Sequence, residues 1–102
     1  MKLEIHPAAE DETQQAALWY DQKKPGLGDE FMDELSEALD QVLAHPLRFP
    51  VMHVVKGREF RRFLLSRFPY AIVYESNGYL IHVFAVAHGA RKPGYWAHRT
   101  DQ

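Results

Sequence analysis

The sequence predicts an α+β fold in which an N-terminal strand and a helical hairpin pack on one face of a small antiparallel sheet. Three observations favour it: helical periodicity up to residue 45, a change to β-branched and aromatic runs after Pro50, and an Asn77-Gly78 turn between the last two runs. The chain has 102 residues, 46% of them hydrophobic, so we expect one domain spanning residues 1–102.

The first half of the chain is expected to form one strand and two helices. Residues 2–6 alternate as a short half-buried strand, and Pro7 suits the first turn of a helix over 8–24. The Pro-Gly break in 23–30 ends that helix, and Asp29 is expected to cap a second one that ends at His45-Pro46. The second helix shows an apolar stripe of Phe31, Leu35, Ala38, Leu39 and Val42.

The second half is expected to form four strands, at 51–55, 60–65, 70–74 and 79–88. Asn77-Gly78 predicts a type I′ hairpin in which Ser76 faces Tyr79 and Tyr74 faces Ile81. Alternation from that turn gives an apolar face expected to pack on the helices: Tyr70, Ile72, Tyr74, Ile81, Val83, Ala85 and Ala87. The other face is mixed and is expected to be wholly or partly open to a partner: Ala71, Val73, Glu75, Leu80, His82, Phe84, Val86 and His88.

Composition and charge narrow the classes of function. The chain has no cysteine, no apolar run of membrane-spanning length and no signal-peptide pattern in residues 1–20, so we expect a cytoplasmic protein without disulfides. Residues 1–50 hold 4 basic and 11 acidic side chains, for a charge of −7, whereas residues 51–102 hold 8 and 3, for +5. This split indicates either a charged partner such as a nucleic acid, or an acidic helix face beside ordinary strand charges.

Three stretches carry a family resemblance that covers essentially the whole chain: "AALWYDQKKPGLGDEF", "FPYAIVYE" and "VAHGARKPGYW". With the order of elements, they resemble the RelE/ParE superfamily of toxins from type II toxin–antitoxin modules, many of which are called plasmid-stabilisation proteins. The resemblance implies a growth-inhibiting toxin that its cognate antitoxin neutralises, in a hetero-oligomer. RelE-like members bind in the ribosomal decoding site and cut mRNA, whereas ParE-like members inhibit DNA gyrase.

The residues favour the ParE-like alternative. Cleavage of RNA through the 2′-OH needs a base, cations for the phosphate and an acid for the leaving oxygen. RelE-like nucleases commonly have an arginine on the central strand just after the Tyr of "FPY", and this chain has Ala71 there. An mRNA endoribonuclease with a rearranged site, and a degenerate module that only binds its antitoxin, stay open as alternatives.

The candidate site residues lie mostly in the C-terminal tail. If the protein is an enzyme, His88, Arg91 and Tyr95 are the catalytic candidates, because Arg91 and Tyr95 match the family's late arginine and aromatic positions. Pro93-Gly94 is expected to bend the tail back across the sheet and bring Tyr95 near Arg91. Residues expected to bind the target or the antitoxin are Arg58, Arg61, Arg67, His82, Lys92, Trp96 and Arg99.

Each candidate also has a purely structural interpretation. His82 lies in mid-strand, where a half-buried histidine is the more common role, and Trp96 is favoured as a cover for the sheet. The tail as a whole could simply fasten the sheet. No metal is expected, since the six histidines show no paired spacing with carboxylates, and no cofactor is expected either. The basic second half is expected to meet an acidic segment of the antitoxin.

Overall fold

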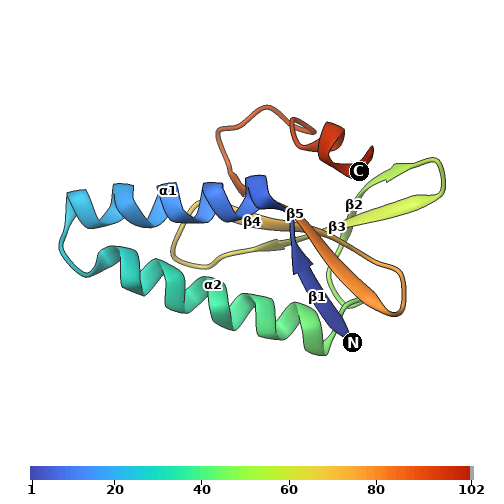
Figure 1. Ribbon diagram of the computed structural model, residues 1–102, viewed down its shortest axis with the longest axis horizontal. Coiled ribbons are helices and arrows are strands. Elements are labelled where there is room, and N and C mark those ends of the chain that lie inside the picture. The colour runs from blue at the N-terminus through green and yellow to red at the C-terminus, as the bar shows by residue number, and fades with distance from the viewer. Residues whose placement is uncertain (102) are drawn as a thin grey trace.

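The computed structural model describes residues 1–101 and shows two helices lying side by side on one face of a five-stranded sheet (Figure 1). In chain order the elements are β1 (Lys2–Ile5), α1 (Pro7–Lys23), α2 (Leu27–Ala44), β2 (Val51–Val55), β3 (Arg58–Leu64), β4 (Tyr70–Ser76), β5 (Leu80–His88) and the short 3₁₀ helix η1 (Ala97–Asp101). The expected α+β fold with a helical hairpin is confirmed.

The sheet is mixed, so the expectation of a purely antiparallel sheet was wrong. Its strand order is β1-β5-β4-β3-β2, and β1 pairs parallel to β5, with Leu3 opposite Ile81. The ladder extends one residue further, because the N–H of His6 donates to the carbonyl of Val83 at 2.8 Å. The first strand thus lies beside the last, a pairing between distant segments that the local pattern does not encode.

The loop between the helices brings their backbones into close approach. Gly26 precedes α2 with φ +89°, a left-handed conformation that favours glycine. A Cβ on Gly28 would lie 2.4 Å from the carbonyl oxygen of Ala17, so a larger residue does not fit there. The predicted cap at Asp29 was wrong, since Asp29 lies in the first turn of α2. Instead the Asp21 carboxylate accepts the N–H of Gly28 at 2.8 Å.

The main core lies between the helical hairpin and the sheet, as expected. Ile72, Ile81 and Val83 are fully buried there against both helices. Aromatic rings fill the end of the core near the helix–helix loop, where the ring centroids of Tyr20 and Phe68 are 4.8 Å apart. This core fixes which face of the sheet the helices cover.

The β4–β5 turn differs from the expected one. Tyr74 faces Val83 rather than Ile81, so the pairing is displaced by two residues. The Asn77 side chain accepts the N–H groups of Tyr79 and Leu80, and only Gly78 in this turn has a positive φ, of 94°. Asn77 therefore caps the turn, and the type I′ prediction was wrong. Two consecutive positive φ values occur instead in the β2–β3 hairpin, at 56 and 57.

A bulge in β5 then reverses the faces of its last residues. The pairing changes from Tyr74–Val83 to Val73–Ala85, which adds one residue to β5. Beyond the bulge Val86 lies on the helix side, and His88 lies opposite Tyr70. The expected placement of Ala85, Ala87, Val86 and His88 was therefore wrong.

The second face of the sheet is covered in part by the tail, so of the two expected states, wholly or partly open, only the partly open one remains. A second core of Phe60, Val73, Phe84, Ala85 and Trp96 lies there. Trp96 is 2% exposed, and its ring centroid lies 5.3 Å from that of Phe60. The interpretation of Trp96 as a cover for the sheet is confirmed.

The main core predicts a large difference between two apolar positions. Ile72→Ala removes a fully buried side chain and should lower the free energy of unfolding by about 2–5 kcal/mol. Leu64→Ala, at a position that is 61% exposed, is the matched control and should change it by less than about 0.5 kcal/mol. Urea denaturation of both variants measures this, and equal losses would contradict the assigned core.

Candidate functional site

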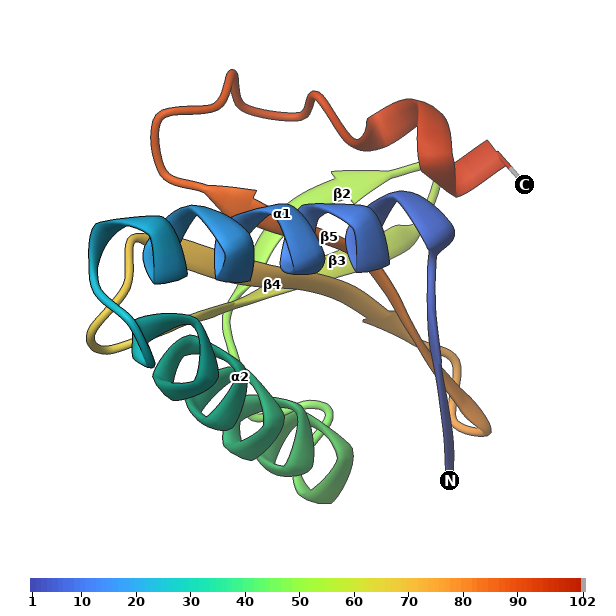
Figure 2. The same ribbon diagram turned by 60° about the vertical axis from the view of Figure 1, so that its left-hand side comes forward.

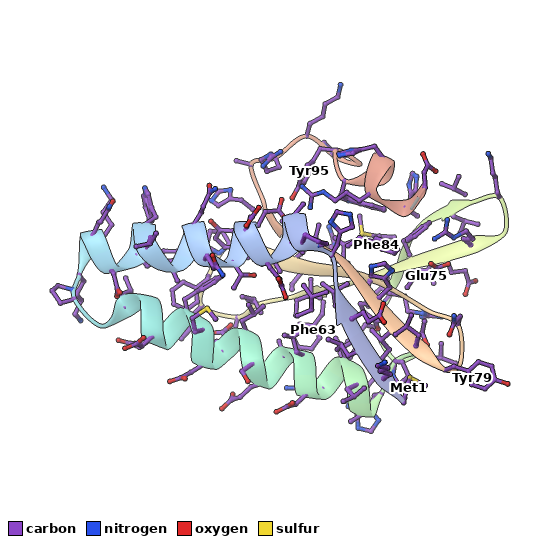
Figure 3. All side chains as sticks on the ribbon, in the orientation of Figure 1. Met1, Phe63, Glu75, Tyr79, Phe84 and Tyr95 are labelled. Carbon is purple, nitrogen blue, oxygen red and sulfur yellow. The ribbon has the colours of Figure 1, made fainter. Side chains whose placement is uncertain are left out.

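The C-terminal tail returns along the molecule after β5 ends. Figure 2 shows it passing above α1 towards the N-terminal end of that helix, where η1 closes the chain. Figure 3 shows Tyr95 in the part of the tail beside α1, and Phe84 on β5. The tail therefore brings residues from the last tenth of the chain against the first helix.

The Glu12 carboxylate of α1 accepts four hydrogen bonds where α1, β5 and the tail meet. One oxygen, Oε1, accepts Arg99 Nη1 at 2.9 Å and the N–H of Val86 at 3.1 Å. The other, Oε2, accepts the Tyr95 hydroxyl at 2.5 Å and Arg99 Nη2 at 3.1 Å. Arg99 Nη1 also donates to the carbonyl of Phe84 at 3.0 Å. This cluster of Glu12, Tyr95 and Arg99 is called the Glu12 clamp below.

The pKa values of both tail residues of the clamp, Tyr95 and Arg99, are raised. Burial and the hydrogen bond to Glu12 raise the pKa of Tyr95 far above its ordinary value, so its hydroxyl remains a donor. Burial by itself would lower the pKa of Arg99, but the bidentate contact with Glu12 outweighs it and raises that pKa. Arg99 is 7% exposed, and its guanidinium is occupied by contacts within the protein.

A cleft of about 360 Å³ lies beside the clamp. Side chains from α1, β4, β5 and the tail line it, including Glu12, Gln15, Trp19, Tyr70, His88 and Arg91. The structure thus brings two of the three catalytic candidates, His88 and Arg91, into one cleft.

Arg91 lies at the cleft over an aromatic ring. Its guanidinium carbon is 3.9 Å from the ring centroid of Tyr95, so the expected approach of these two residues is confirmed. Arg91 is exposed, and no carboxylate of residues 1–101 forms a salt bridge with it. Its charge is therefore available to a ligand.

His88 also lines the cleft and is held there by its neighbours. Its Nδ1 accepts the N–H of Ala90 at 2.9 Å, which leaves Nε2 as the nitrogen free of that bond. Its ring stands edge-on to Tyr70, with centroids 5.0 Å apart. The Tyr95 hydroxyl, in contrast, is engaged by Glu12, so the three candidates do not share one reaction centre.

Besides Arg99, the other three predicted binding arginines also have partners within the protein. Arg58 contacts both oxygens of Glu75 and the carbonyl of Thr100. The Glu75 hydrogen bond raises the pKa of Arg58. Arg61 donates to the carbonyls of Leu47 and Phe49, and Arg67 pairs with Glu30 at 2.8 Å.

Of the predicted cations, Arg91 and Lys92 are exposed and have no salt bridge in residues 1–101. The charge of the second half therefore does not form one continuous free patch.

His82 lies away from the cleft, on the sheet face opposite the helices. Its ring packs on Phe84, with centroids 4.2 Å apart, and it is half-buried. Burial is the largest cause that lowers its pKa, and the charges of Glu4, His6, Glu75 and Arg58 act on it in opposing directions. The structure does not bring His82 together with His88.

Two residues that sequence analysis did not select belong to this site. Glu12 has the pattern of an ordinary acidic residue in a first helical turn, and its tail partners lie more than 80 positions away. Trp19 lines the cleft although it is 53% exposed, and the Nζ of Lys23 lies 4.9 Å from its ring centroid. The exposed Trp within "AALWY" is the one signal that could have identified it.

Residues 1–101 contain no group of three or more His, Asp or Glu side chains that could hold a metal ion. No helix in the same residues is long and apolar enough to cross a bilayer.

The lowered pKa of His82 predicts a stability that depends on pH. In the unfolded chain His82 binds a proton at the ordinary pKa of 6.5, whereas in the folded protein it does so only at a lower pH. The free energy of unfolding should therefore fall as the pH drops from 7 through 6.5 towards the lowered pKa. His82→Gln should flatten this part of the profile, measured by urea denaturation at several pH values. A variant with the full slope of the wild type would contradict this.

Comparison with known proteins agrees with the α+β fold and with the family resemblance of the sequence. A family model described as the ParE toxin of the type II toxin–antitoxin system parDE matches residues 3–93. No curated protein matches the sequence. The match covers β1 through the cleft residues His88 and Arg91, which is most of the chain. The protein belongs to the ParE toxin family of type II toxin–antitoxin systems, within the RelE/ParE superfamily.

Proposed function

We propose that this toxin acts by binding a protein target such as DNA gyrase, and that the cleft with Trp19, His88 and Arg91 is its contact surface. The observation that carries the proposal is the Glu12 clamp, which uses the Tyr95 hydroxyl and the Arg99 guanidinium for structure. The guanidinium of Arg91, the imidazole of His88 and the exposed indole of Trp19 remain available at the cleft. These three groups are suited to the recognition of a protein surface.

The mRNA endonuclease alternative is less well supported. Cutting RNA needs several cations around the phosphate, with a base and an acid on either side. Ala71 stands at the position of the nuclease arginine and is buried. The hydrogen bond to Glu12 and the raised pKa of Tyr95 make its hydroxyl a poor proton source or base. His88 and Arg91 alone do not complete the set.

A protein surface suits the cleft chemistry. Trp and Arg are the residues that most often dominate binding energy in protein interfaces, because they combine large apolar area with directed hydrogen bonds. The planar guanidinium of Arg91 can bind a carboxylate through two hydrogen bonds. Trp19 offers an exposed ring on the same cleft.

The family implies an antitoxin partner, and we propose that this partner binds through an acidic segment. Arg91 and Lys92 are the exposed cations of the tail whose charges no carboxylate of residues 1–101 neutralises. The association rate of toxin and antitoxin should fall as salt rises from about 0.05 to 0.5 M, because screening shortens the range of attraction. Stopped-flow measurement tests this, and a rate independent of salt would contradict it.

Arg91→Ala tests the proposed contact surface. The loss of a charge-assisted contact in a desolvated interface should lower toxic potency by roughly 30–1,000-fold, since such contacts contribute about 2–4 kcal/mol. Growth arrest without antitoxin measures potency, and thermal unfolding shows that the variant is folded. Arg48→Ala, at an exposed position outside the cleft, is the matched control and should retain full toxicity.

Strains that express the wild type, Arg91→Ala, His88→Ala or Tyr95→Phe separate gyrase binding from mRNA cleavage and from antitoxin binding alone. Inhibition of gyrase supercoiling by the wild type, lost in Arg91→Ala, supports the proposal. Cleaved mRNA that disappears in His88→Ala and Tyr95→Phe would establish the nuclease instead. A folded wild type that binds antitoxin without arresting growth would leave the degenerate module, and a folded Arg91→Ala that is fully toxic would overturn the proposed surface.

A further inference from the structure

We propose that Glu12 is a positioning residue: it fixes the Tyr95 ring as a platform, and the platform presents the Arg91 guanidinium to the cleft. The inference rests on the proposed function, because it assigns to Glu12 the geometry of that function's main cation. Glu12 itself lines the same cleft, so the residue that orients the platform and the cation it controls face one cleft.

The first step is the attachment of the ring. The Tyr95 hydroxyl donates to Glu12 Oε2 at 2.5 Å, which fixes the far end of the phenol against α1. Arg99 holds the same carboxylate by both terminal nitrogens, and its guanidinium carbon lies 5.2 Å from the Tyr95 centroid. The ring is therefore fixed by α1 and by the 3₁₀ helix together.

The second step is the cation that lies on this ring. The guanidinium carbon of Arg91 is 3.9 Å from the Tyr95 centroid, close enough for a cation–π contact. The arginine side chain is long and flexible, so a free one loses rotamer freedom when it binds. A side chain already stacked on a fixed ring loses less, and the clamp thereby strengthens binding without contacting the target.

The clamp differs from the anchor that attaches the tail to the sheet. Trp96 is buried in the second core, where it also meets the His53 ring at 6.0 Å. This contact, together with the Arg99–Glu12 ion pair, keeps the tail attached when only the Tyr95 hydroxyl loses its bond to Glu12. The Tyr95 ring also packs against the second core. Loss of its hydroxyl should therefore loosen the ring without detaching the tail, which makes the two roles separable by experiment.

Tyr95→Phe and Glu12→Gln test the positioning role. Tyr95→Phe keeps the ring and removes its hydrogen bond, whereas Glu12→Gln removes the charge that holds Arg99. NMR order parameters of the arginine Nε–Hε groups in the purified toxin report side-chain mobility. The Arg91 value should fall in both variants, while that of Arg48, outside the cleft, stays unchanged. An unchanged Arg91 value in Tyr95→Phe would overturn the inference.

A double-mutant cycle separates positioning from mere stability. Tyr95→Phe should lower toxic potency roughly tenfold in the wild-type background and have no further effect in Arg91→Ala, because nothing remains to be positioned. Additive effects in the double variant would overturn the positioning role. If Arg91→Ala is fully toxic, the proposed function fails, and the order parameters still decide whether Glu12 fixes Arg91.

Discussion

The ion pair between Glu12 and Arg99 is the contact on which the arrangement of the functional end depends. It joins the first helix to the last turn of the chain, and both side chains are largely withdrawn from solvent. A buried carboxylate is stable only when its oxygens accept hydrogen bonds, and Glu12 accepts four. Removal of one partner from such a pair typically costs about 3–5 kcal/mol, because the other charge is then left unpaired.

The cleft results from this contact and from the bulge in β5. Without the extra residue of the bulge, the alternation of β5 would place His88 on the opposite face from Tyr70. With it, His88 turns to the helix side and lies at the cleft with Trp19. The tail then leaves the sheet after His88, at the end of β5, and brings Arg91 to the same cleft. The cleft therefore depends on both the bulge in β5 and the ion pair between Glu12 and Arg99.

Much of the fold could be predicted from the sequence, because its signals are local. The amphipathic stripe of α2 and the change of period after Pro50 gave the elements within a few residues. The parallel pairing of β1 with β5 could not be predicted, since it joins opposite ends of the chain. The register predicted from Asn77-Gly78 was wrong, because Asn77 caps the turn through its side chain and its backbone is not left-handed.

The site was predictable only in part for a similar reason. Arg91 and Tyr95 were expected to meet, because Pro93-Gly94 bends the short segment between the strand and η1. Arg99 was expected to bind a partner, and no local pattern shows that Glu12, 87 positions earlier, neutralises it. Trp96 was expected both as a contact and as a cover, and its burial against Phe60 accounts for the second role.

Amide hydrogen exchange of the purified toxin tests most directly whether the clamp determines the placement of the tail. In Glu12→Gln, exchange should become faster at the Val86 amide and in residues 95–101, while α2 and the β3–β4 pair keep their protection. Glu10→Gln, the same substitution at an exposed position of α1, should match the wild type. Unchanged protection of the tail in Glu12→Gln would contradict the central role of this carboxylate.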